Sequence, residues 1–325
     1  MKKIFALAGI LLALGCGSVF AKKAKAETNK VKVVTTIFPE YDWARQVIGE
    51  KADNVELTLL LDNGVDLHSF SPSVKDIAKI QDADIFVYVG GESDEWVDEV
   101  LKNVKKPNQK VINLLEVLGD RVKAEEIVEG MEHEHEHHDE HAHEEEEELD
   151  EHVWLSLKNA QILTSAITSA LCEVDAKNAE VYKKNLASYN AKLDALDAKY
   201  VEAVKVASKN TLVFGDRFPF RYMVEDYNLK YFAAFTGCSA ESEASFKTIV
   251  FLSEKVNELG LNTVCQIETG NGKIAKTVIS NSKNKKAKVL TFDSLQSTTA
   301  KQIKKGATYL GAMEKNLEVL KEALK

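Results

Sequence analysis

Cysteine and proline are scarce in this chain, which has four of each among its 325 residues. No two cysteines form a Cys-x-x-Cys pair, and this absence excludes a zinc ribbon or a dithiol redox motif. Lys and Arg (42) are outnumbered by Asp and Glu (51), so the charge balance does not suggest a nucleic-acid partner. With 45% hydrophobic residues, the chain is long enough to build two lobes, each of ordinary domain size.

The negative charge is concentrated in one segment. The formal net charge is -9, but residues 131–151 contain twelve acids and no Lys or Arg, so the rest of the chain sums to +3. The stretch GMEHEHEHHDEHAHEEEEELDEHVW, residues 130–154, also holds seven of the eight histidines. The acidity is therefore a local property of a His- and Glu-rich run and not a property of the whole molecule.

The N-terminus has the pattern of an export signal. Two lysines precede an apolar run that extends to Leu14, and this run is too short to span a bilayer as a stable helix. The ending Leu-Gly-Cys resembles a bacterial lipobox, although Ala13 stands where leucine is usual. We therefore expect residues 1–21 to be a signal peptide of the lipoprotein type, with cleavage before Cys16 and lipidation of the Cys16 thiol.

A soluble exported form is the alternative, with cleavage after Ala21 or Ala26. In either case residues 22–30, which are rich in lysine and alanine, are expected to form a flexible tether. No later stretch is long and apolar enough to cross a membrane. The sequence thus predicts an exported protein, either periplasmic or held at the cell membrane by a lipid anchor.

Runs rich in Val, Ile and Thr alternate with helical patterns along the chain, which favours an α/β fold with mainly parallel sheets flanked by helices. In the first half we expect strands at 31–37, 55–61, 84–89 and 110–114, with helices at 41–49, 72–81 (capped by Ser71) and 95–103. In the second half we expect strands at 211–214, 230–235, 263–267 and 288–292, with helices at 218–227, 243–259, 272–281 and from 297 onward.

Residues 175–208 contain neither Gly nor Pro, and large side chains recur on one stripe at helical spacing. This stripe consists of Tyr182, Leu186, Tyr189, Leu193, Leu196 and Tyr200. The segment predicts one helix of about 30 residues, roughly 45 Å long, that joins two lobes as a rigid strut. The expected domains are therefore an N-terminal α/β lobe at 31–174, which includes the His/Glu-rich loop at 131–151, a linker helix at 175–208 and a C-terminal α/β lobe at 209–325.

Polar side chains with metal-binding chemistry follow several of the predicted strands. His68 lies on the loop after the second strand, and His152 opens the helix that leads to the strut. In the second half, Asp216, Glu268 and Asp293 each follow a strand. Each of these residues alone is more often a polar loop residue or a helix cap. Because ligands of parallel α/β sheets bind at the carboxyl ends of strands, the shared position favours one cation site between the lobes.

The sequence resembles the metal-binding solute-binding proteins of zinc and manganese ABC importers, and most of all the zinc-uptake members with a His-rich loop. The matching segments are VVTTIFPEYDWARQVIG, GVDLHSFSPSVKDIAKIQDADIFVYVG, DEHVWLSLKNAQ, TLVFGDRFPFRYMVEDYNL and VLTFDSL. The resemblance implies a binding protein and not an enzyme, with one metal held in an interlobe cleft by His68, His152 and Asp293. It also implies an ABC permease and its ATPase as partners, and we expect a monomer.

One position departs from the family pattern. Zinc members usually carry histidine and manganese members glutamate where this chain has Gly215, and glycine has no ligand atom in its side chain. The fourth ligand is left open between Glu268, Asp216, water and a histidine of the His/Glu run. Two histidines suit Zn²⁺, and two histidines with two carboxylates also accept Mn²⁺. Clustered imidazoles hold zinc far better than manganese, so we expect Zn²⁺ as the transported ligand, with Mn²⁺ as the alternative.

The His/Glu run lacks apolar residues and cannot fold by itself, which is compatible with a solvated charged loop that has no role. Its histidines favour a second interpretation, an auxiliary metal loop that collects cations and passes them to the cleft. These histidines are His133, His135, His137, His138, His141 and His143.

Export permits disulfides, and Cys238 and Cys265 both lie near the ends of predicted strands. We therefore expect these two cysteines to pair, which leaves Cys172 as a small buried hydrophobic residue.

Two other functions compete with metal transport. A zinc hydrolase would hold its metal with His68, His152 and Asp293 and use Glu268 as general base. Against it, no His-Glu-x-x-His motif lies on a predicted helix, because the HEHEH tract has no apolar stripe. A surface metal buffer or adhesin that works without a transporter is the third possibility.

Overall fold

The computed structural model describes residues 30–131, 148–239 and 243–325. The expected signal peptide with Cys16, nearly all of the tether and the six histidines from His133 to His143 lie outside the described residues. Within the described part, no helix combines the length and the hydropathy that a membrane crossing requires.

Two four-stranded parallel sheets form the centres of two lobes, as the strand patterns predict. The first sheet has the order β2-β1-β3-β4 and consists of β1 (Val31–Thr35), β2 (Val55–Leu59), β3 (Ile85–Tyr88) and β4 (Lys110–Asn113). The second has the order β6-β5-β7-β8 and consists of β5 (Thr211–Arg217), β6 (Lys230–Phe235), β7 (Thr263–Ile267) and β8 (Lys288–Phe292). The two halves of the chain therefore repeat one strand order.

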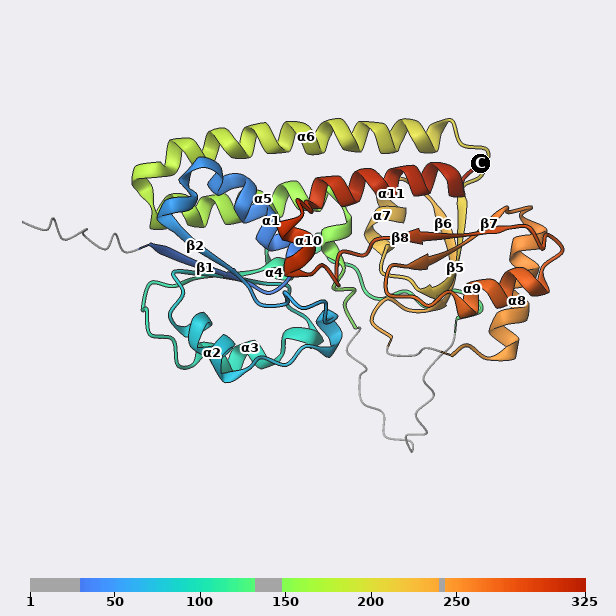
Figure 1. Ribbon diagram of the computed structural model, residues 1–325, viewed down its shortest axis with the longest axis horizontal. Helices are drawn as coiled ribbons and strands as arrows, with labels where there is room; N and C mark the ends of the chain where they lie inside the picture. Colours follow the sequence, from blue (N-terminus) through green and yellow to red (C-terminus); the bar gives the residue numbers. More distant parts are fainter. Residues whose placement is uncertain (1–29, 132–147, 240–242) are drawn as a thin grey trace, which may run out of the picture.

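Helices cover both sheets (Figure 1). The first lobe has α1 (Phe38–Ile48), α2 (Val74–Gln81), α3 (Trp96–Leu101), α4 (Leu114–Leu118) and α5 (Leu157–Val174); α6 (Ala179–Lys205) follows, and the second lobe has α7 (Arg221–Asp226), α8 (Phe246–Glu258), α9 (Lys273–Asn281), α10 (Ala300–Lys304) and α11 (Tyr309–Ala323). The expected cap at Ser71 is wrong, because Ser73 caps α2 instead. Its hydroxyl accepts from the Asp76 N–H, and the Asp76 carboxylate accepts from the Ser73 N–H, which completes a capping box.

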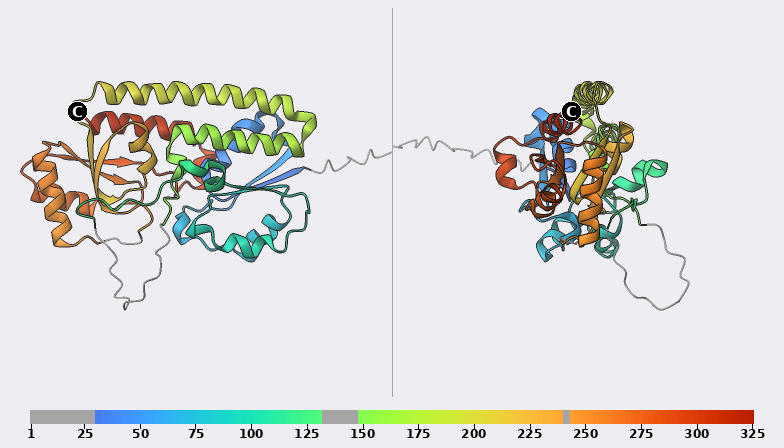
Figure 2. Two further views of the ribbon diagram at one scale, coloured as in Figure 1. Left: turned by 180° about the vertical axis from the view of Figure 1, so that it is seen from behind. Right: turned by 90° about the vertical axis from the view of Figure 1, so that its right-hand side faces the viewer.

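The long helix α6 runs along both lobes, and the view from behind in Figure 2 shows it spanning both sheets. It has 27 residues, fewer than expected, because Asp175 ends α5 and a short 3₁₀ turn, Ala176–Asn178, precedes α6. Asn185 donates to the Val47 carbonyl of α1 at 2.9 Å, and the Tyr200 hydroxyl donates to the Met313 carbonyl of α11 at 2.6 Å. The helix is thus hydrogen-bonded to both lobes.

One hydrophobic core extends through both lobes, and a smaller one is confined to the second. At the boundary, the Trp154 indole N–H of the first lobe donates to the Ser294 carbonyl of the second at 2.9 Å. The Tyr309 hydroxyl at the start of α11 donates to the Trp154 carbonyl at 2.7 Å, and the Tyr309 ring packs edge-on against Trp43. The lobes are therefore packed against each other and not merely tethered by α6.

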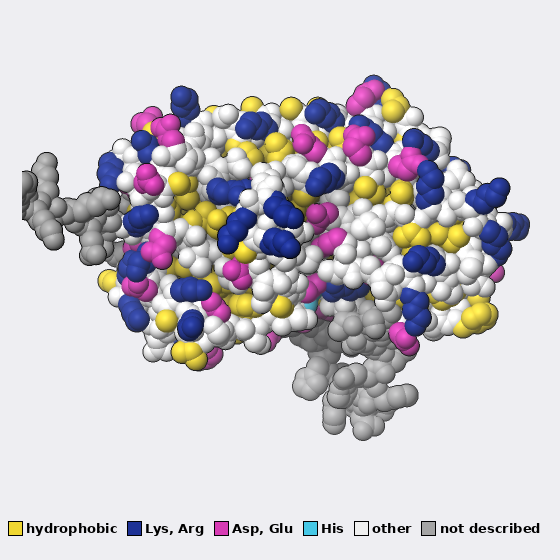
Figure 3. All heavy atoms as spheres, viewed as in Figure 1, with side chains coloured by type: hydrophobic (Ala, Val, Ile, Leu, Met, Phe, Trp, Pro, Cys, Tyr) yellow, Lys and Arg dark blue, Asp and Glu magenta, His cyan; other side chains and the backbone are white. Residues whose placement is uncertain are grey.

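The described part of the surface carries charges of both signs. Acidic and basic side chains are interspersed over the face in Figure 3, and basic side chains gather over α10 at its middle. There Lys301, Lys304 and Lys305 are exposed.

Candidate metal centre

His68 is held by the loop that follows β2. It lies on a 3₁₀ turn, Leu67–Ser69, in which Leu67 is fully buried. The Asp66 carboxylate caps this turn by accepting from the His68 N–H at 3.2 Å. On the ring, Nδ1 lies 2.8 Å from the Ser93 hydroxyl, so Nε2 is left to face the lobe boundary.

His152 is fixed by burial and by two hydrogen bonds to one carboxylate. It precedes a 3₁₀ turn, Val153–Leu155, whose three side chains are buried, and its own side chain is fully buried. Asp150 Oδ1 accepts from both the His152 backbone N–H and ring Nδ1, each at 2.9 Å. A carboxylate on one ring nitrogen fixes the tautomer and turns the other nitrogen toward a metal, as in many metal sites.

The two histidines meet at their remaining ring nitrogens. His68 Nε2 lies 3.1 Å from His152 Nε2. Burial and the proximity of His152 lower the pKa of His68 to about 3, so its imidazole is neutral at physiological pH. Burial disfavours charge on His152, but Asp150, Glu151 and Glu125 more than offset it and raise the pKa of His152. His68 is therefore neutral before a metal binds, whereas a proton on His152 is favoured and has to leave before its Nε2 can act as a ligand.

Cys238 brings a third ligand atom to this pair, and it comes from the second lobe. Its Sγ, His68 and His152 each offer an atom, and these atoms all lie within 4.8 Å of one another. Burial raises the pKa of the Cys238 thiol, with further contributions from Glu125, Glu151 and Asp150. The sequence pattern assigns Cys238 to a disulfide, although the rule that points to His68 also points here, because Cys238 follows the end of β6 by three residues.

The disulfide predicted between Cys238 and Cys265 is not formed, and all three described cysteines are free. Cys265 is buried inside β7, where it pairs with Phe214 of β5, whereas Cys238 lies on the loop that faces the two histidines. Cys172 is only half-buried in α5, and its thiol donates to the Ala179 carbonyl at 3.6 Å.

The expected ligand Asp293 and the two candidates for a fourth ligand, Glu268 and Asp216, accept hydrogen bonds within the second lobe, and none of them joins the group of ligand atoms around the histidines. Glu268 accepts from the Ser294 N–H (2.7 Å), the Ser294 hydroxyl (2.8 Å) and the Ser297 hydroxyl (3.0 Å). Asp293 accepts from the Leu295 N–H at 2.9 Å. Asp216 accepts from the N–H groups of Arg217 (2.9 Å) and Ile267 (3.2 Å). Burial raises the pKa of each of these carboxyls.

The missing side chain at Gly215 has a steric explanation. A Cβ atom there would lie 2.5 Å from Ala275 Cα and 2.6 Å from Ala275 N, both in the backbone of α9. Real Cβ atoms do not approach backbone so closely, so α9 packs on β5 only because residue 215 is glycine. Histidine or glutamate at this position requires α9 to move.

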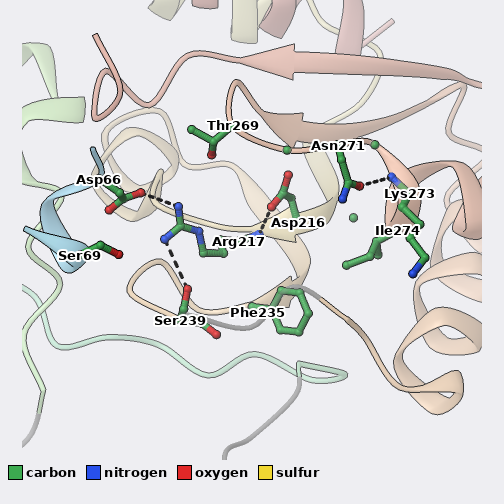
Figure 4. Close-up of a pocket in the computed structure, with 13 residues that line it drawn as sticks. Asp66, Ser69, Asp216, Arg217, Phe235, Ser239, Thr269, Asn271, Lys273 and Ile274 are labelled. Atoms are coloured by element: carbon green, nitrogen blue, oxygen red, sulfur yellow. Dashed lines mark hydrogen bonds and ion pairs between the residues drawn. The ribbon is translucent and has the colours of Figure 1, made fainter. Parts of the chain in front are cut away.

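A cavity of about 310 Å³ lies beside the centre, between the loop of Asp66 and the strand ends of the second lobe (Figure 4). Arg217 crosses it: one guanidinium nitrogen donates to Asp66 Oδ2 at 2.7 Å, and another donates to the Ser239 carbonyl at 3.4 Å. The Arg217 and Asp66 side chains are only 15% and 17% exposed. Because Asp66 also caps the turn of His68, this ion pair connects the second lobe to the backbone of a candidate ligand.

Glu125, Glu148 and Cys238 form a second group of possible ligand atoms within 4.8 Å of one another. The Glu125 N–H donates to the Glu148 carbonyl at 2.8 Å, and Ala124 and Leu149 form an isolated antiparallel bridge. These contacts close the base of the segment that carries the six clustered histidines. The described residues at the base of this segment thus lie next to Cys238.

Two parallel-sheet lobes packed against each other, with a buried histidine pair at their boundary, define the class of two-lobed α/β proteins. Residues 33–323 match the family described as zinc-uptake complex component A, periplasmic (ZnuA), and the chain belongs to this family.

Relatives of known name agree with this family. The chain is 34% identical over 322 residues to the zinc-binding lipoprotein AdcA of Streptococcus pneumoniae, an alignment that covers 99% of this chain and 61% of AdcA. It therefore spans about three fifths of the length of the AdcA proteins that it matches. It is 33% identical over 315 residues to the high-affinity zinc uptake system protein ZnuA of Bacillus subtilis, which covers 97% of this chain and 94% of the relative.

Solved structures share the fold. The Zn(II)-bound ZnuA-like domain of Streptococcus pneumoniae AdcA is 29% identical with a TM-score of 0.69, over 91% of this chain and 99% of that domain. The metal-dependent lipoprotein YcdH of Bacillus subtilis is also 29% identical, with a TM-score of 0.72 over 91% of this chain and 99% of its own.

Proposed function

We propose that this chain is the extracytoplasmic substrate-binding component of an ABC importer, which captures Zn²⁺ between its lobes and delivers it to the permease and its ATPase. The observation that carries the proposal is the approach of His68 Nε2 to His152 Nε2 at 3.1 Å, with Asp150 holding the buried ring of His152. Two ring nitrogens so close cannot both carry a proton, so one donates to the other, and a cation that accepts a lone pair from each replaces that hydrogen bond.

The choice of zinc is supported by ligand chemistry and by the relatives. Imidazole nitrogens favour zinc over manganese, which prefers carboxylates and water. Both curated relatives carry zinc in their names, and one of the solved neighbours is zinc-bound. We keep Mn²⁺ as the alternative cargo. In this proposal His68 and His152 are ligands. Asp293 is kept as a ligand as well, since a carboxylate that accepts one hydrogen bond, here from the Leu295 N–H to Oδ1, keeps lone pairs for a metal. Glu268 and Asp216 stay candidates for the fourth position.

The proposal extends to the parts of the chain outside the described residues. We propose that Cys16 is the site of lipidation, as the lipoprotein relative suggests, and that the protein acts at the membrane surface as a monomer. The six histidines from His133 to His143 serve as a weaker auxiliary site. The domain boundaries proposed above, with the linker at 175–208, place the metal between the two lobes.

The family is a transport component and not an enzyme class, which disfavours the zinc hydrolase. Glu268 also gives no support to a general base, because both of its carboxylate oxygens accept hydrogen bonds from Ser294 and Ser297. A base must be free to take a proton from water.

Titration calorimetry with Zn²⁺ tests the proposal. We expect the full mature chain to show one tight site and several weaker ones. His68→Ala and His152→Ala should each abolish the tight site. Replacing residues 132–147 by a short Gly-Ser linker is the matched control, since it removes six other histidines and should remove only the weaker sites. Loss of the tight site in this linker variant would contradict the proposal.

A further inference from the structure

The second lobe needs a ligand of its own if the cation lies between the lobes. At Gly215 no side chain fits, because α9 closes over that position at 2.5 Å. Asp216 accepts from the N–H groups of Arg217 and Ile267, Glu268 from the two serines that follow β8, and Asp293 from the Leu295 N–H. None of these three carboxylates has an atom in the group around the two histidines. Among the groups that the structure describes, the side chain of the second lobe that reaches the histidine pair is Cys238.

The approach of this loop to His152 depends on the preceding glycine. A Cβ atom at Gly237 would lie 2.8 Å from His152 Cε1, 3.0 Å from its Nδ1 and 3.1 Å from the Phe218 carbonyl. Any larger residue pushes the loop away from the imidazole. The Cys238 N–H donates to Glu125 Oε1 at 3.0 Å, which anchors the loop to the first lobe. A glycine and an anchoring carboxylate thus bring the thiol to the ring nitrogens.

The surroundings of the three groups favour a positive charge. Glu151 is only 2% exposed, and its Oε2 has no hydrogen-bond partner. This oxygen lies 3.5 Å from His68 Nδ1. Together with Asp150 on the far nitrogen of His152 and Glu125 on the loop, three carboxylates surround the two imidazoles and the thiol. A buried carboxylate oxygen without a donor is costly unless a cation nearby compensates it.

We propose that Cys238 coordinates the metal as a thiolate together with His68 and His152, and that it is a ligand of the second lobe in place of a side chain at position 215. This inference rests on the proposed function and adds the ligand that determines which metal ions the site prefers. On binding, the S–H bond breaks, a bond between sulfur and metal forms, and the proton passes to the buffer. A His₂Cys set is softer than one of histidines and carboxylates, so it favours Zn²⁺, Co²⁺ and Cd²⁺ over Mn²⁺.

Cobalt substitution tests the assignment on the whole mature protein. Co²⁺ bound to a thiolate has a charge-transfer absorption in the near ultraviolet, which imidazole and carboxylate ligands do not produce. We expect this band in the wild type, its loss in Cys238→Ser, and its retention in the matched controls Cys172→Ser and Cys265→Ser. In competition titrations, Cys238→Ser should weaken Zn²⁺ binding by about 100-fold. Loss of a group that only supports a ligand costs about 10- to 100-fold, so loss of a ligand should reach at least the upper end of that range. The affinity for Mn²⁺ should fall much less.

The outcomes separate the two proposals. Tight binding of Co²⁺ to the wild type without the band overturns the assignment of Cys238 and leaves the proposed function standing. A band that persists in the His68→Ala, His152→Ala double variant also overturns it, because the thiol then binds metal with Glu125 and Glu148 and not with the imidazoles. Failure of the wild type to bind Zn²⁺ or Co²⁺ tightly overturns the proposed function itself. Because the band is measured first on the wild type, the assignment stays falsifiable even if Cys238→Ser does not fold.

Discussion

The two lobes share one strand order but prepare their side chains for different tasks. In the first lobe, His68 and His152 are each oriented by a neighbouring group before any metal arrives. In the second lobe, Asp216, Glu268 and Asp293 are occupied with hydrogen bonds that shape their own loops. The difference teaches that a polar side chain that follows a strand can either turn toward the lobe boundary, as His68 does, or fix neighbouring backbone, as Glu268 does. The first lobe is the preformed half of the site.

The largest expected effect concerns pH and lies in the first lobe. Burial raises the pKa of Glu40 to about 8 and that of Asp94 to about 7. In the unfolded chain such carboxyls titrate near 4, so the folded protein retains protons that the unfolded chain has lost. The contribution of Glu40 to the free energy of unfolding should therefore be fully present below about pH 4.5. It should be lost as the pH rises toward 8, which lowers the free energy of unfolding by up to about 4 kcal/mol.

Glu40→Gln isolates this contribution. Urea unfolding between pH 5 and 9 should show a clearly flatter profile for Glu40→Gln than for the wild type. The exposed residue Glu56 provides the matched control, since Glu56→Gln should leave the profile unchanged. An unaltered slope in Glu40→Gln would show that Glu40 is ionised in the folded protein.

The second effect would make the lobes more alike by restoring a ligand at position 215. Gly215→His places a Cβ atom against the α9 backbone, where Ala275 Cα would be 2.5 Å away. We expect a loss of about 3 kcal/mol in the free energy of unfolding, as is typical of overpacking at a rigid contact, and no gain in zinc affinity. Urea unfolding and calorimetry measure the two quantities. The control Gly119→Ala has open space around it and should cost only about 1 kcal/mol, from its left-handed backbone.

A stable Gly215→His variant with tighter zinc binding would show that α9 adapts to the new side chain. In that case the second lobe could offer a ligand from β5 as well.

The smallest effect compares one supporting carboxylate from each lobe. Asp150→Asn removes the charge that orients His152, and we expect zinc affinity to fall by roughly 10- to 100-fold with little change in stability. Glu268→Gln should do the reverse: it loses an acceptor for Ser294 and costs about 1–2 kcal/mol of stability while zinc affinity stays near that of the wild type. Calorimetry measures the zinc affinity of both variants, and thermal unfolding measures their stability. Equal losses of affinity would remove the distinction between the lobes.

Much of this architecture could be predicted from the sequence because it depends on periodicity. The strand runs and the stripe of Tyr182, Tyr189 and Tyr200 on α6 follow from local patterns. The same holds for His68 on the loop after its strand and for His152 ahead of α5. Ser71 was a reasonable cap by the same rules, but Ser73 is the residue followed by an acid three positions later, which completes the box.

The remaining parts of the site depend on contacts between distant segments. Glu268 and Asp216 offer carboxylates in the sequence, and only the folded loops reveal that Ser294 and Ile267 already use them. Cys238 follows a predicted strand as the other candidates do. Its role becomes visible only when Gly237 brings the loop against His152.

The hydrophobic core shared by both lobes has a consequence for how long a cation stays bound. Swinging the lobes apart would expose Trp154 and Tyr309, both fully buried, at about 1.5–3 kcal/mol for each large side chain. Each ~1.4 kcal/mol added to a barrier slows a step tenfold, so full separation of the two lobes is a rare event for the isolated molecule. In the proposed function, the dwell time of the metal would then depend on local changes at the boundary, above all on separation of the pair of Arg217 and Asp66 that holds the turn of His68. A partner that separates this pair shortens the residence of the metal without unpacking the core.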